Sequence, residues 1–117
     1  MKLWSWDHLI FRGIKMKSAR SKATDIPKSV KEAVEKRDHG KCIICGKRGV
    51  GNSHFIRRSQ GGLGIEENVA TMCHECHYVY DNGFGIERQL ITELFEGYLQ
   101  EQYPDWDKSK LVYQKFD

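Results

Sequence analysis

A histidine followed by two arginines lies between two pairs of cysteines, and these residue types together suit the hydrolysis of a phosphodiester. His54 belongs to the segment NSHFIRRSQGG, and His77 directly follows the second cysteine pair. An imidazole titrates near neutral pH and can therefore take a proton from water. Asp81 lies four residues after His77, so on a helix the two side chains share one face and form half of a site for a divalent cation. A base, a cation and positive charge are what phosphodiester hydrolysis needs.

Arg57 and Arg58 are the candidates for holding a phosphate. The segment HFIRR is predicted to be extended, so these two side chains are expected to point to opposite faces. One guanidinium is expected to reach a phosphate near His54, because its fork of N–H donors matches phosphate geometry. The other is expected to pair with an acid, and the sequence leaves open which arginine does which.

The four cysteines form two Cys-x-x-Cys knuckles, Cys42–Cys45 and Cys73–Cys76, separated by 27 residues. Each knuckle places two thiolates on one tight turn, and two such turns close a tetrahedral Zn²⁺ site. A redox role is the competing interpretation, but it needs only one pair, and neither pair lies in a convincing βαβ context. Four thiolate ligands leave no open position on the metal, so we expect a structural zinc ion.

Four elements are predicted around these residues: a helix over 25–38, a second strand over 67–72, a short helix from Cys73 to near Gly83, and a longer amphipathic helix over 86–99. Pro27 suits the first turn of the first helix, and Gly40 ends it. The last helix carries an apolar stripe that stops before Pro104. Packing of this stripe in the core is favoured over a second interaction surface. The tail from Asp105 is expected to be an ordered strap, because it keeps several large apolar residues.

The chain divides into a basic and aromatic N-terminal arm over residues 1–25 and a domain over residues 26–117. The arm begins with an apolar stretch that contains Trp4 and Trp6. The basic run KMKSARSKATD follows, and it is predicted to be flexible because it has almost nothing to bury. The run is interpreted as a linker or, alternatively, as a contact with a phosphate backbone.

The composition limits the classes of protein to which this chain can belong. At 117 residues it has room for one small domain, and a metal would help to stabilise it. No stretch approaches 18 consecutive apolar residues, and the N-terminus lacks a continuous apolar signal region, so we expect a cytoplasmic protein without a membrane partner. Residues 1–60 hold 15 Lys and Arg against 5 Asp and Glu, whereas residues 61–117 hold 4 against 11. Such a polarised charge is typical of a nucleic-acid binder.

The segments KCIICG, NSHFIRRSQGG and EENVATMCHECH resemble the HNH endonucleases. The pattern of that family is a first-strand histidine, a loop asparagine and a helix histidine in a ββα-metal unit. The resemblance covers residues 36–84, and YLQEQYPDW is similar to the small phage and prophage members. It implies an α+β fold, in which a ββα-metal (His-Me finger) core with a four-cysteine structural zinc site is flanked by N- and C-terminal helices. Residues 85–117 would be the C-terminal helix and tail.

The resemblance also implies a role for each residue of the motif. His54 would be the general base, and His77 would bind the catalytic cation. Asn68 would brace the loop or orient His54, although an asparagine there could simply cap a turn. Asp81 stands where many members have another metal ligand. The catalytic cation would be Mg²⁺ or Mn²⁺, in addition to the structural Zn²⁺.

One position departs from the family. The residue before the base is usually Asp or His and binds the cation, but here it is Ser53. A neutral hydroxyl is a poor ligand, so cation binding is expected to be weaker unless Asp81 or water fills the position.

These features predict a metal-dependent DNA endonuclease of phage or prophage type, acting in the bacterial cytoplasm. No helix that could contact the base edges of DNA is evident, so sequence specificity is expected from a protein partner, from DNA structure or from a homodimer. The alternative, motivated by Ser53, is a zinc-stapled nucleic-acid-binding module without catalytic activity.

Overall fold

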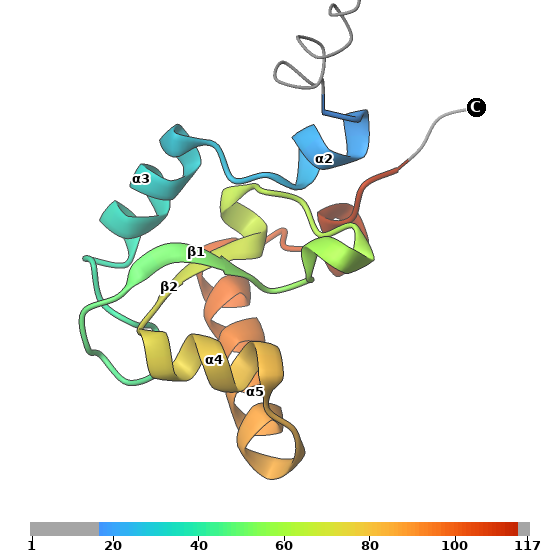
Figure 1. The fold of residues 1–117 in the computed structure, drawn as a ribbon. Helices are drawn as coiled ribbons and strands as arrows, with labels where there is room; N and C mark the ends of the chain where they lie inside the picture. Colours follow the sequence, from blue (N-terminus) through green and yellow to red (C-terminus); the bar gives the residue numbers. More distant parts are fainter. Residues whose placement is uncertain (1–16, 115–117) are drawn as a thin grey trace, which may run out of the picture.

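The computed structural model describes residues 17–114 of the chain. The helices and strands are, in order, α2 (Ala19–Thr24), α3 (Lys28–Arg37), β1 (Val50–His54), β2 (Val69–Met72), α4 (His74–Asn82) and α5 (Gly85–Gln102) (Figure 1). Short 3-10 turns lie at Arg58–Gln60, Glu66–Asn68 and Lys108–Leu111. The fold is α+β, as the sequence predicts. The expectations for Trp4, Trp6 and the start of the arm concern positions outside the described residues.

The two strands form an antiparallel sheet that leads directly into α4. Val50 pairs with Met72 and His54 pairs with Val69, and the register shifts between Val50 and Ser53. Cys73 caps the N-terminus of α4, because its sulfur accepts a hydrogen bond from the backbone N–H of Cys76. The predicted second strand and the predicted short helix are therefore confirmed, each within about two residues. The sheet thus fixes α4 relative to β1.

Aromatic packing joins the end of β1 to α4 and α5. The ring centroids of Phe55 and Phe95 are 5.2 Å apart in an edge-to-face arrangement, and those of Tyr80 and Phe95 are 5.3 Å apart. The Tyr80 hydroxyl also donates a hydrogen bond to the carbonyl of Phe55. Such pairs stabilise a core beyond the area that they bury. The segment after His54 is thereby held against α4.

A buried polar network ties α3 to β2 and α5. Arg37 donates to the backbone carbonyl of Val69 at 2.8 Å and to the Tyr103 hydroxyl at 3.0 Å, and it forms an ion pair with Asp38. Asp38 in turn accepts from the Tyr98 hydroxyl. Burial and the bond to Asp38 raise the pKa of Tyr98 to about 12. The first long helix was predicted over 25–38, and α3 confirms it over Lys28–Arg37.

Residues 17–25 of the run KMKSARSKATD do not form the flexible segment that its composition predicts. Ala19–Thr24 is helical, with Ser18 accepting the backbone N–H of Ser21 as the N-terminal cap. Thr24 is buried, and its hydroxyl donates back to the carbonyl of Arg20 at 2.9 Å. Arg20 also donates to the backbone carbonyl of Ser59 at 3.0 Å. The short helix is therefore docked on the loop that follows β1.

The apolar stripe of α5 is only partly in the core. Phe95 and Leu99 are fully buried, but Ile86, Leu90 and Leu94 are 74%, 54% and 56% exposed. The prediction of core packing was therefore wrong for these three residues, whereas Ile91 packs against the core as predicted. Within residues 17–114, no helix is both long enough and apolar enough to cross a membrane.

The C-terminal segment is the ordered strap that the sequence predicts, as far as residue 114. Leu111 is buried, and the Trp106 indole donates to the carbonyl of Glu67 at 2.7 Å. Val112 pairs with Gly62 in an isolated bridge. The strap thus packs against the loop between β1 and β2, and at Val112 it adjoins Arg20 of α2 beside Gly61.

Candidate active site and metal centre

The four cysteines come together as a candidate metal centre. The sulfur atoms of Cys42, Cys45, Cys73 and Cys76 all lie within 4.8 Å of one another. A tetrahedral zinc ion with Zn–S bonds near 2.3 Å would hold its sulfurs about 3.8 Å apart. The spacing and the soft thiolate ligands are consistent with zinc. The four residues could hold a metal ion, as predicted from the two knuckles.

Backbone N–H groups prepare these sulfurs for a cation. The N–H of Ile44 donates to the sulfur of Cys42, and the N–H of Cys76 donates to that of Cys73, each at 3.4 Å. Burial alone would raise the pKa of Cys42, but backbone hydrogen bonds within the two knuckles outweigh it and lower this pKa to about 7. The first knuckle thus favours thiolate charge at Cys42, whereas burial raises the pKa of Cys73 and of Cys76, whose thiolates a bound metal would stabilise.

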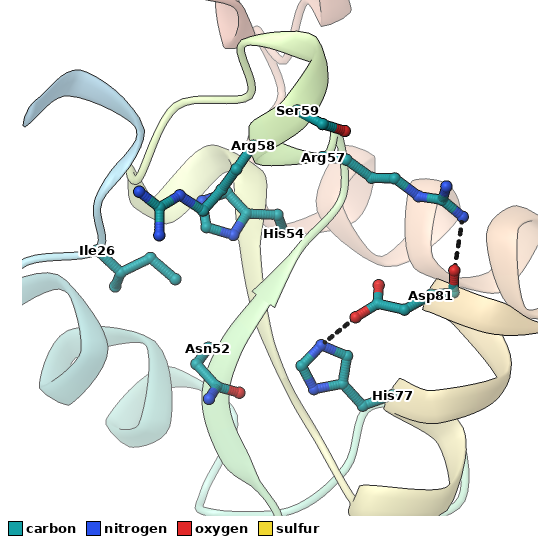
Figure 2. Close-up of a pocket in the computed structure, with 8 residues that line it drawn as sticks. All are labelled: Ile26, Asn52, His54, Arg57, Arg58, Ser59, His77 and Asp81. Carbon is teal, nitrogen blue, oxygen red and sulfur yellow. Dashed lines mark hydrogen bonds and ion pairs between the residues drawn. The ribbon is translucent and has the colours of Figure 1, made fainter. Parts of the chain in front are cut away.

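A separate cavity of about 490 Å³ contains most of the predicted site residues, among them His54 and His77 but not Asn68. Its walls are Ile26, Asn52, His54, Arg57, Arg58, Ser59, His77 and Asp81 (Figure 2). Asn52 and His54 come from β1, and His77 and Asp81 come from α4. Side chains two residues apart on a strand share a face, which is why Asn52 and His54 both face the cavity.

His54 is half-buried and its ring is held by the N-terminal helix. The ring atom Nε2 lies 2.9 Å from the backbone carbonyl oxygen of Thr24, the last residue of α2. A carbonyl oxygen can only accept, so Nε2 must carry the proton of a neutral ring. Nδ1 is then the nitrogen with a free lone pair. The contact selects the tautomer in which Nδ1 can act as a base.

The surroundings of His54 keep its ring neutral. Burial lowers its pKa, and the positive charge of Arg58 acts in the same direction. The carbonyl of Thr24 and the charge of Asp81 oppose this change without reversing it. The pKa of His54 therefore lies below 6.5, and the ring is unprotonated at neutral pH.

His77 and Asp81 are paired on one face of α4. Nε2 of His77 lies 2.8 Å from a carboxylate oxygen of Asp81, one helical turn away (Figure 2). Arg57 donates to the carbonyl of Asp81 at 3.1 Å and to that of Tyr80 at 3.2 Å, so it satisfies backbone groups at the C-terminal end of the helix. Both predicted ligands are accessible from the cavity and are held by the segment after β1.

Across residues 17–114, the four cysteines are the one group of three or more Cys, His, Asp or Glu side chains whose ligand atoms converge. His54, His77 and Asp81 share a cavity without converging in that way. The ring of His54 is turned to Thr24, and that of His77 is turned to Asp81. A hard cation among the three residues would therefore complete its shell with water, as Mg²⁺ ordinarily does.

Ser53 lies outside the cavity that His54, His77 and Asp81 line. Its side chain is fully buried, does not line the cavity, and has a hydroxyl oxygen with no hydrogen-bond partner. Successive side chains of a strand point to opposite faces, so Ser53 points away from the face that carries His54. The expectation of a cation ligand at Ser53 is corrected by this placement. Asn52 is the strand neighbour that shares the cavity with His54.

The two arginines do not alternate on a strand. β1 ends at His54, and Arg58 already belongs to a 3-10 turn, so both side chains reach the same cavity. Arg58 pairs with Asp25, as one of the two arginines was expected to pair with an acid. Lys17 and Arg58 together lower the pKa of Asp25. The prediction of an extended HFIRR segment was wrong because the chain bends at Phe55 and Ile56, directly after β1.

Asn68 braces the loop between the strands. Its carbonyl oxygen accepts from the N–H of Ile56 at 2.8 Å, and its amide donates to the carbonyls of Ile56 at 3.1 Å and Leu63 at 2.8 Å. The side chain is fully buried and does not line the cavity. Of the roles that the sequence left open, bracing the loop is the one that these contacts fit.

Two contributors to the site were missed from the sequence. Thr24 contributes through its backbone carbonyl, which carries no residue-specific signal. Asn52 could have been found from strand alternation, because it stands two residues before His54.

Comparisons with known proteins found no match: no family model matches the chain, and neither the curated proteins nor the solved structures gave a significant match.

Proposed function

We propose that this chain is a metal-dependent DNA endonuclease of the HNH kind, hydrolysing a phosphodiester in the cavity lined by His54, His77 and Asp81. The observation that carries the proposal is the shared cavity: a neutral imidazole, an imidazole–carboxylate pair and two guanidinium groups surround one space. These are the groups that water activation, cation binding and phosphate binding require.

His54 has the first role. Nε2 donates its proton in a hydrogen bond to the carbonyl oxygen of Thr24, so Nδ1 accepts the proton of the attacking water. The depressed pKa keeps that nitrogen free at neutral pH. Arg58 is the guanidinium with freedom to meet a phosphate, because its side chain is 54% exposed and its partner Asp25 is already neutralised by Lys17.

His77 and Asp81 have the second role. Their ring nitrogen and carboxylate would hold a divalent cation, Mg²⁺ or Mn²⁺, with water in the remaining positions. When bound, such a cation stabilises charge on the phosphate and on the leaving oxygen. Asn52 offers an amide oxygen on the same cavity wall, where Ser53 does not reach. The four cysteines would hold a structural Zn²⁺ that fixes the first turn of α4, and with it His77.

A non-catalytic nucleic-acid-binding module is the second candidate. A buried, neutral serine at the position where the family has Asp or His favours it, because the cavity then offers fewer charged ligands than a catalytic cation usually has. Such a module would keep the basic groups around the cavity and bind DNA without cutting it.

The experiment that separates the two candidates uses supercoiled plasmid and zinc-loaded protein in Mg²⁺ or Mn²⁺. The endonuclease relaxes the plasmid, and His54→Ala does not. His39→Ala is the matched control, because His39 is an exposed histidine away from the cavity and its loss should leave nicking intact. A shift in plasmid mobility with no nicking in any metal would support the binding module instead.

A further inference from the structure

A second hollow, of about 590 Å³, adjoins the cavity of His54. Asn52 and His77 line both spaces, so they form the boundary between them. The second hollow extends from this boundary toward the cysteine knuckles, where Arg48 and His74 line it. Arg48 follows the first knuckle, and His74 is the first residue of α4. The two hollows therefore make one groove, which runs from Arg58 past His77 to Arg48.

Arg48 is an arginine of this groove without a side-chain partner among residues 17–114. Its side chain is exposed, and with the other residues of the 17–114 range it makes neither an ion pair nor a side-chain hydrogen bond. Arg57, in contrast, donates to backbone carbonyls of α4, and Arg58 is paired with Asp25 at the other end of the groove. The acid of the second hollow, Glu35, already accepts the backbone N–H of Gly51 at 2.9 Å. Arg48 is therefore the side chain at this end of the groove that is free among residues 17–114 to meet an anion, while Glu35 is held by Gly51.

The surface between these charges suits a nucleic-acid strand. Val50 is 43% exposed and lines the second hollow together with buried Met72, so an apolar patch lies between polar ends. A strand presents sugars and bases between its charged phosphates, and the phosphates recur every 3.4 Å or so of helix axis. A strand with one phosphate beside His54 must therefore place a neighbouring phosphate close by along the groove.

We propose that Arg48, assisted by the ring N–H of His74, binds a phosphate that flanks the scissile one on the same DNA strand. The inference rests on the proposed function for its substrate class, and it adds a subsite and a direction for the strand. Arg48 positions the substrate and takes no part in proton transfer. A phosphate contact of this kind fixes register and carries no sequence information.

The test compares Arg48→Ala with Lys47→Ala, since Lys47 is an exposed neighbour of the same charge that lines neither hollow. Binding of a fluorescently labelled DNA duplex to the zinc-loaded full chain is measured over a range of salt concentrations, with Ca²⁺ in place of Mg²⁺. Loss of one phosphate contact reduces the slope of log K against log salt by about 0.9. We expect that reduction for Arg48→Ala, none for Lys47→Ala, and substantial recovery for Arg48→Lys. Nicking by Arg48→Ala should show a raised KM with kcat unchanged.

Equal salt slopes for Arg48→Ala and Lys47→Ala would overturn the subsite. If the wild type nicks DNA but these slopes agree, only the subsite fails. If the wild type binds DNA without nicking, the proposed catalysis fails while the slope still reports on Arg48. Absence of DNA binding would overturn both. Equal thermal midpoints and zinc contents for the variants ensure that the comparison is between folded proteins.

Discussion

The backbone carbonyl of Thr24 lies 2.9 Å from Nε2 of His54, although the two residues are thirty positions apart in the chain. This contact joins the N-terminal helix to the strand that carries the proposed base. It fixes the tautomer of the ring and contributes to its burial. The chemistry of the cavity therefore depends on a segment whose composition predicts only a flexible run.

The pH dependence of cleavage should report the lowered pKa of His54. Burial is the main cause of that lowering, and the base is active only when unprotonated. The rate should therefore stay constant as the pH falls toward 6.5 and decline only below it, because the ring becomes protonated at the lower value. A pH–rate profile at saturating cation checks this. An acidic limb centred above 6.5 would contradict the assigned environment of His54.

The substitution Gly64→Ala should change the surroundings of His54 indirectly. A Cβ at Gly64 would lie 1.9 Å from the carbonyl oxygen of Asp25, so the segment after α2 and the Gly64 loop must separate, which should disturb the contact between Thr24 and His54. Nicking should fall, and the acidic limb should rise toward 6.5 as the burial of the ring is lost. Gly97→Ala is the control, because nothing lies within 4 Å of its added Cβ and the helix should tolerate it.

If Gly64→Ala does not fold, Arg20→Ala provides a milder version of the same test. It removes only the contact between Arg20 and the carbonyl of Ser59. An unchanged pH profile in a folded variant with a displaced α2 would show that the helix does not set the properties of His54.

Asn68→Ala should lower the stability of the fold. The substitution removes three hydrogen bonds and leaves buried backbone groups of Ile56 and Leu63 without partners. The expected loss in the free energy of unfolding is about 2–4 kcal/mol. Denaturant unfolding of the zinc-loaded protein measures it. Asn82→Ala, at an exposed asparagine, should change the stability by less than about 0.5 kcal/mol, and equal effects of the two variants would contradict the bracing role.

Removal of metal should separate structure from catalysis. Mild chelation of the divalent cation should stop nicking and leave the thermal unfolding transition in place. A chelator strong enough to strip the four cysteines should abolish that transition, because a structural metal contributes its binding free energy to folding. Calorimetry with parallel zinc analysis checks both. A thermal midpoint unchanged after complete zinc loss would contradict a structural role for the cysteine cluster.

The elements with strong local signals were predictable from the sequence. The two knuckles, α3, β2 and α4 follow from ligand spacing, from proline and glycine positions and from hydrophobic patterning. The cavity was predicted through the spacing of His77 and Asp81 and through the resemblance that singled out His54. These features depend on residue types that the chemistry or the backbone requires.

The errors came from contacts between distant segments. Helix α2 forms although its composition is polar, because Arg20, Thr24 and Asp25 dock on the loop after β1. Propensity alone cannot predict such tertiary docking. The placement of Ser53 follows from strand alternation: Ser53 and His54 are neighbours on β1, so their side chains point to opposite faces.

The proposed mechanism requires that one divalent cation binds in the cavity between His54 and His77. Titrating zinc-loaded protein with Mn²⁺ while observing the histidine ring signals by NMR tests it most directly. We expect the signals of both rings to broaden with one common affinity and those of exposed His39 to stay sharp. We also expect Asp81→Asn to weaken the broadening of both ring signals together. Broadening at neither ring, or at His77 alone with His54 unaffected, would contradict it.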